Sequence, residues 1–110
     1  MIEVELPDGK IEAELADSFF ERTVGLSGRS GGKMLFVFPR ETRTRVDMML
    51  LSEPLHLYFL DSDRNVIGVQ RAEPWSWDPR TWRLYSPSEP YRYLLESFEE
   101  LDVEEGDSME

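Results

Sequence analysis

The first fifteen residues alternate between apolar and charged side chains. Apolar residues alternate with glutamates over residues 2–6 and again over residues 11–15, and a Pro-Asp-Gly sequence lies between the two runs. A period of two places successive side chains on opposite faces of a strand, and Pro, Asp and Gly favour tight turns. The pattern predicts a β-hairpin with one face toward a core and the other toward water.

The most apolar stretch of the chain is LHLYFLDSDRNVIGV at residues 55–69. Residues 55–60 form one extended apolar run, and β-branched residues resume over residues 66–69. Between them, residues 61–65 carry short polar side chains that hydrogen-bond to their own backbone in turns. This stretch predicts a second hairpin at the centre of the fold.

Three more apolar runs complete the expected sheet. They are residues 34–38, followed by Pro39, residues 46–51, and residues 91–95, where side chains again alternate. Proline cannot donate to a sheet ladder, so we expect the first of these strands to stop at Pro39. The runs together predict a mainly β, single-domain fold over residues 1–110: a small antiparallel β sandwich or barrel with one short helix.

The short helix is predicted just after the first hairpin. Ser18 and Glu21 have the spacing of a capping box, and the helix would end near Gly25 or Gly28. The glycine-rich residues 25–32 do not match a phosphate-binding loop, because a strand follows them where such a loop needs a helix. We interpret them as a connector.

Composition and charge narrow the possible partners. The chain has no cysteine and a formal net charge of -11. The charge repels nucleic-acid phosphates and anionic membranes, and no apolar run approaches the roughly 18 residues of a spanning helix, so we expect neither nucleic acid nor a membrane as partner. The missing cysteine and an acidic start unlike a signal peptide predict a cytoplasmic protein. The end is strongly acidic, and we expect it to be flexible from about residue 104.

The sequence predicts no metal and no cofactor. His56 is the single histidine, and no cysteine is present to join it. The turn that begins at Asp61 starts like a calcium loop, but Val66 and Ala72 stand where the loop needs a glycine and a bidentate glutamate. An enzyme is still an alternative, because Asp47 and His56 would serve a carboxylate-assisted hydrolase or isomerase if a bulge brought them to one face.

Two stretches are candidates for binding. The segment from residue 73 to residue 90 combines three tryptophans, four prolines and two arginines. Proline stiffens the backbone and indole offers a flat apolar face, so a rigid loop would stack on a sugar, a base or a partner's side chain. The alternative is that the indoles cap the open end of the β core beneath the arginines. The candidate ligand-binding residues are Trp75, Trp77, Trp82, Arg80 and Arg83.

The second candidate is a basic patch. Arg40, Arg43 and Arg45 lie close together in an otherwise acidic chain. They would make the domain a protein-interaction module for an acidic partner, or they would simply guard an edge strand.

In their order, these motifs resemble a family called domain of unknown function 192, also known as uncharacterised protein family 0127. The matching pieces are ADSFFERTVGLSGR (16–29), KMLFVFP (33–39), PLHLYFLDSDRNVIGV (54–69), YRYLLE (91–96) and Gly106-Asp107. The resemblance implies a compact, mainly β sandwich or barrel with one short helix.

The chain departs from that family where polar residues would stand. The family pattern FWMKNT is replaced here by VDMMLL at residues 46–51, which keeps only Met48, and His56 replaces an aspartate. No family activity is therefore carried over. Arg64 stands where the family's turn often has glycine, so we expect Asn65 to take the left-handed conformation. The sequence favours a small, non-enzymatic binding or accessory domain whose small ligand or protein partner is unknown.

Overall fold

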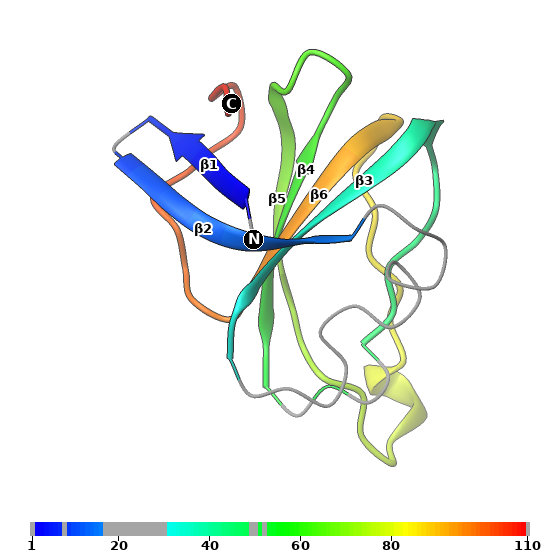
Figure 1. The fold of residues 1–110 in the computed structure, drawn as a ribbon. Coiled ribbons are helices and arrows are strands. Elements are labelled where there is room, and N and C mark those ends of the chain that lie inside the picture. The colour runs from blue at the N-terminus through cyan, green and yellow to red at the C-terminus, as the bar shows by residue number, and fades with distance from the viewer. Residues whose placement is uncertain (1, 8, 17–30, 49–50, 52, 110) are drawn as a thin grey trace.

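Six β-strands form one twisted sheet within the described residues, in the spatial order β1-β2-β3-β6-β4-β5 (Figure 1). The computed structural model describes residues 2–7, 9–16, 31–48, 51 and 53–109, and the structural statements below concern these residues. The strands are β1 (Ile2–Leu6), β2 (Gly9–Ala16), β3 (Lys33–Thr42), β4 (Leu55–Leu60), β5 (Val66–Ala72) and β6 (Tyr91–Ser97). A short 3-10 helix, η1 (Pro79–Thr81), lies between β5 and β6. In this part of the chain, no helix has the length and apolar character that a membrane crossing needs.

The mainly β fold is confirmed, and both predicted hairpins are present. β1 pairs antiparallel with β2, with Val4 opposite Ile11, and β4 pairs antiparallel with β5, with Phe59 opposite Gly68. These are the two places where a period-two apolar pattern flanks a clear turn signal. The predicted helix at Ser18 lies outside the described residues.

The turn of the second hairpin differs by one residue from the expectation. The Asp61 carboxylate accepts hydrogen bonds from the backbone N–H groups of Asp63, at 2.9 Å, and Asn65, at 3.0 Å. The left-handed residue is Arg64, with φ 66°, and not Asn65. Asn65 already pairs with Ser108 in an antiparallel bridge, which requires an extended backbone, so the reversal falls one residue earlier.

One pair of strands is parallel, which corrects the expectation of a fully antiparallel sheet. β2 and β3 run in the same direction, with Leu15 opposite Leu35 and Ala16 opposite Phe36. Parallel pairing needs a long crossover connection, and residues 17–32 provide one between these two strands. The β3 strand then pairs with β6, which comes last in the chain.

Two further strand predictions were wrong. β3 continues past Pro39 to Thr42, because its pairing with β6 is interrupted between Val37 and Thr42 and the missing proline N–H falls in that irregular stretch. Of the run 46–51, the described residues 46–48 and 51 belong to no strand of the sheet, and among them Val46 makes a bridge with Tyr85. Burial of this run comes instead from side chains such as Met48, which is 0% exposed.

The sheet is covered on both faces, and each face has its own core. The first core contains Met34, Phe36, Met48, Leu55, Leu57, Phe59, Tyr91 and Leu94, with Ala16, Leu51 and Ala72. The second core contains Val4, Ala13, Tyr58, Leu60, Val66, Leu95, Val103 and Met109. Val4 and Ala13 come from the β1–β2 hairpin, so this hairpin closes over the second core.

The acidic C-terminal end, which the sequence predicts to be flexible from about residue 104, makes hydrogen bonds to the central turn. The backbone N–H of Val66 donates to the Asp107 carbonyl at 2.8 Å, and the N–H of Met109 donates to the Arg64 carbonyl at 3.0 Å. The Met109 side chain is 2% exposed in the second core. The buried Met109 side chain and these backbone hydrogen bonds attach the acidic segment to the central turn.

The left-handed conformation of Arg64 yields the first prediction. A left-handed backbone costs a non-glycine residue about 1–2 kcal/mol, which glycine avoids. Glycine loses more conformational entropy on folding, and this offsets part of the gain. Arg64→Gly is therefore expected to raise the free energy of unfolding by about 0.5–1 kcal/mol, measured by chemical denaturation. Arg64→Ala, which keeps a Cβ, is the control and should not stabilise. A less stable glycine variant would contradict the assigned turn.

Candidate functional site

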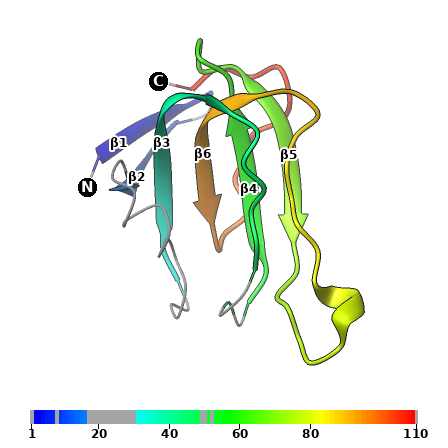
Figure 2. The ribbon, with the colours of Figure 1, turned by 90° about the vertical axis from the view of Figure 1, so that its right-hand side faces the viewer.

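The tryptophan loop, residues 73–90, connects β5 to β6. Its tip, with η1, extends beyond one end of the sheet, and the chain then runs back beside β5 to the start of β6 (Figure 2). Its base is attached to the body of the protein. The backbone groups of Tyr85 and Val46 exchange two hydrogen bonds at 2.8 and 2.9 Å, and the side-chain amide of Gln70 donates to the Ser86 carbonyl at 2.9 Å. The Tyr85 hydroxyl accepts from the Glu73 N–H at 3.2 Å. The loop is therefore fixed on both sides.

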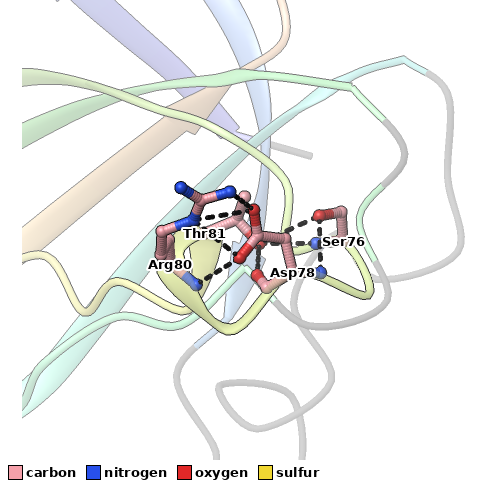
Figure 3. Close-up of polar contacts among 4 residues, drawn as sticks. All are labelled: Ser76, Asp78, Arg80 and Thr81. Atoms are coloured by element: carbon pink, nitrogen blue, oxygen red, sulfur yellow. Dashed lines mark hydrogen bonds and ion pairs between the residues drawn. The ribbon is translucent and has the colours of Figure 1, made fainter.

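The tip of the loop is held by its own polar side chains (Figure 3). Asp78 caps η1 by accepting from the Arg80 N–H at 3.0 Å, and its carboxylate also pairs with the Arg80 guanidinium at 2.7 Å. The Thr81 hydroxyl accepts from the Ser76 N–H at 2.8 Å and donates to the Asp78 carbonyl at 2.7 Å. Hydrogen bonds from the Arg80 side chain and then its backbone lower the pKa of Asp78. Asp78 is thus ionised at neutral pH and keeps the cap.

The three indoles of the loop have different environments. Trp75 is half-buried against the first core, and its Nε1 donates to the Arg83 carbonyl at 2.8 Å. Trp82 is 53% exposed, lies 6.2 Å from Trp75 between ring centroids, and donates to the Ser76 carbonyl at 2.8 Å. Trp77 is 99% exposed. Trp75 and Trp82 therefore support the loop, and Trp77 projects from it.

The two arginines of the loop are not placed alike. The guanidinium of Arg80 faces the Asp78 carboxylate, and Arg83, which is exposed, contributes its carbonyl to Trp75. The sequence grouped five residues as one ligand-binding set, and the structure brings all five onto one loop. Most of the five make hydrogen bonds or an ion pair with other residues of the same loop.

Asp47 and His56, the weak catalytic candidates, are not brought to one pocket. His56 lies on the face of β4 that carries Tyr58, in a cavity of about 430 Å³ with Gln70 and Arg71. Asp47 acts electrostatically on Glu96, whose side chain lies on the opposite face of the sheet. No bulge realigns His56, because it remains in regular pairing with both Arg71 and Ser97.

Glu96 is a buried carboxyl that the sequence did not single out. It lies on central strand β6, opposite Met34 on one side and Leu57 on the other, and is 6% exposed. Burial, and then the negative charge of Asp47, raise its pKa to about 8. Since Asp47 is exposed, a proton donor inside the first core lies near a carboxylate that reaches solvent. Glu96 shares its face of β6 with Leu94, which is buried in the first core.

The basic patch begins in the last part of β3, which carries Arg40, and continues into the segment that follows, which carries Arg43 and Arg45. Arg40, Arg43 and Arg45 are all exposed. The segment is anchored by the Tyr91 hydroxyl, which donates to the Thr44 carbonyl at 2.6 Å. The arginines therefore face water from a fixed backbone, and their role in binding an acidic partner remains a prediction.

Comparison with known proteins places these features in a family. The model of DUF192, described as an uncharacterised ACR, matches residues 2–110. The chain belongs to the DUF192 family. A UPF0127 protein of Pyrococcus furiosus is 33% identical over 108 residues, which cover 92% of this chain and 87% of the relative. A UPF0127 protein of Thermococcus gammatolerans is 35% identical over 102 residues, but these cover 86% of this chain and only 62% of that longer protein.

Solved structures share the DUF192 fold. A protein of unknown function from Novosphingobium aromaticivorans has a TM-score of 0.80 at 21% identity and covers 99% of this chain and 84% of its own. A protein from Sinorhizobium meliloti, described as a candidate transcription regulator, has a TM-score of 0.78 at 26% identity, with 98% and 89% covered. These likenesses establish the fold, and no specific function follows from the DUF192 relatives.

Within the DUF192 pattern, Met48 is the one residue of FWMKNT that this chain retains, and its side chain is 0% exposed in the first core. The retained residue is therefore a packing residue. The neighbouring Asp47 stands at the position of the pattern's tryptophan and supplies the charge that faces Glu96.

The raised pKa of Glu96 predicts a pH-dependent stability. The pKa is about 8 in the folded chain against 4.5 for an unperturbed glutamate, so between these values the folded state holds a proton that the unfolded state has lost. This stabilisation is complete below about pH 4.5 and is lost as the pH rises through about 8. Glu96→Gln should therefore gain Tm relative to the wild type between pH 5 and pH 8. The exposed Glu100→Gln is the control, and its Tm should differ from that of the wild type by the same amount at every pH. A pH-independent Tm difference for Glu96→Gln would contradict the assignment.

The division among the tryptophans predicts two different stability effects. Trp75→Ala removes a ring packed on the first core and is expected to cost about 2 kcal/mol or more in the free energy of unfolding. Trp77→Ala removes an exposed ring and should change it by less than about 0.5 kcal/mol. Both values come from urea denaturation followed by circular dichroism. Equal losses would show that the two side chains share one role.

Proposed function

We propose that this DUF192 domain is a non-enzymatic interaction module that binds a partner protein through Trp77. The observation that carries the proposal is the 99% exposure of that indole on a loop fixed by hydrogen bonds. Exposed large apolar groups gather there, since Trp82 is 53% and Leu84 47% exposed on the same loop. Tryptophan is enriched among the residues that dominate protein-interface energies.

The shape of the loop favours a protein over a small ligand. Small molecules bind in concave sites that enclose most of their surface. Neither described cavity, of about 430 and 360 Å³, includes a residue of the tryptophan loop. A projecting indole instead inserts into a pocket on another protein, with Trp82 and Leu84 as the surrounding apolar contact.

The rigidity of the loop supports tight docking. A binding surface that is ordered before it meets its partner loses less conformational entropy on association. The Asp78 cap and the indole bond of Trp82 to Ser76 order the backbone on both sides of Trp77. The charge of Arg80 is matched by Asp78, so the loop presents apolar surface with little net charge at its tip. The partner we infer has an apolar pocket, and nucleic acid is not the partner. We place the interaction in the cytoplasm, where a chain without cysteine is at no disadvantage.

The test compares three immobilised forms of the domain in extracts of its source organism: wild type, Trp77→Ala, and Val69→Ala as a matched control. Val69 is 39% exposed on β5 and is not part of the loop. Proteins retained by wild type and control but lost with Trp77→Ala are identified and purified, and their affinity is measured by calorimetry. Loss of a hot-spot tryptophan should weaken binding roughly 30-fold or more.

Identical capture by all three forms would overturn the proposal. The comparison is informative because Trp77→Ala is expected to leave the fold intact, and a thermal unfolding curve of each form verifies this. Arg43→Glu serves as a further arm: if it, and not Trp77→Ala, removes the captured protein, the basic patch is the interface.

A further inference from the structure

An apolar cavity of about 360 Å³ lies between the β1–β2 hairpin and the rest of the sheet, and none of its lining residues belongs to the tryptophan loop. Its walls include Val4, Leu15, Leu35, Val37, Leu60 and Tyr93. In Figure 1 this region lies where the hairpin, the β4–β5 turn and the C-terminal segment approach one another. Pockets for small molecules begin at roughly 300 Å³, so the cavity suits a small occupant.

Among the described residues, several apolar side chains that line this cavity stay partly exposed. Leu15 is 36% exposed, and Val37 is only half-buried. Leu35 and Tyr93 are also half-buried, although they pack against the second core. Apolar area left in water is unfavourable in proportion to its size, at about 25 cal/mol per Å². An apolar occupant would therefore be bound by covering walls that the fold leaves open.

One guanidinium group, that of Arg64, lines the cavity and can pair with an anion. Arg64 lines it, with its guanidinium carbon 5.7 Å from the centre of the Tyr93 ring, and Arg92 lies 5.8 Å from the same ring. Arg92 is held by a 3.1 Å bond from its Nε to the Phe38 carbonyl. The one acid in the lining, Glu3, pairs with Lys10 at 3.3 Å. The lining thus carries one arginine and one paired glutamate, in a chain whose net charge is -11.

Arg64 occupies a backbone position at which glycine would be favoured. Its φ of 66° is unfavourable for any residue with a Cβ. An arginine side chain at this turn is thus placed over Tyr93 in spite of the local backbone, at the mouth of an apolar cavity. Guanidinium pairs with carboxylate through two parallel hydrogen bonds, which fixes both the charge and the orientation of the bound group.

We propose that this cavity binds a small amphiphilic monocarboxylate, with its apolar body between β1 and β6 and its carboxylate at Arg64. The site is separate from the tryptophan loop, so it stands or falls independently of the proposed partner interaction. An uncharged chain of the same length would gain the apolar contacts but not the guanidinium bond.

The experiment titrates the purified domain with octanoate, and with 1-octanol as the uncharged probe, by calorimetry and by NMR of the Tyr93 and Leu15 signals. Octanoate is expected to bind saturably and roughly tenfold or more tightly than octanol. Arg64→Gly should remove that preference while raising the stability of the domain, so the loss cannot come from unfolding. Arg71→Ala, in the other cavity, should leave octanoate binding unchanged.

Three results would overturn the inference. Equal binding of octanoate and octanol would leave only a nonspecific apolar surface. An unchanged octanoate affinity in Arg64→Gly would remove the role of the guanidinium. Binding to phosphatidylglycerol vesicles without saturable binding of free octanoate would assign the groove to a membrane lipid instead. Leu15→Glu, which places a like charge at the rim, should weaken octanoate binding if the inference is right.

Discussion

Burial of adjacent β6 side chains on opposite faces of the sheet is the constraint on which the rest of the structure depends. Leu94 is 2% exposed in the first core and Leu95 is 0% exposed in the second. A strand that is apolar on both sides must lie inside the sheet, between two partners and beneath two covers. β3 and β4 are its partners, and the β1–β2 hairpin is one of its covers.

The sequence was most informative where local pattern and local turn chemistry agreed. The two hairpins have an apolar period of two and a recognisable turn, and both are present. Its limits appear where pairing is decided by distant residues: nothing within residues 9–16 specifies that this strand will run parallel to β3. Likewise, the apolar character of residues 46–51 reflects burial of side chains such as Met48 and not a place in the ladder.

The same limit applies to the candidate sites. The tryptophan loop could be recognised from its composition, but composition does not separate the indole that packs on the core, Trp75, from the one that projects, Trp77. Glu96 could not be found because a glutamate in an alternating strand is normally assigned to the wet face. It is buried because neither face of β6 is exposed to solvent in the second half of the strand.

The short parallel pairing of β2 with β3 affects how the β1–β2 hairpin is attached to the rest of the sheet. The β1–β2 hairpin has five cross-strand residue pairs within itself but only three with β3. It is joined to the body by a short ladder and by side chains that reach into the second core. Such a unit is suited to local unfolding as one piece, with Glu14–Ala16 as its junction, while strands β3, β6, β4 and β5 stay paired.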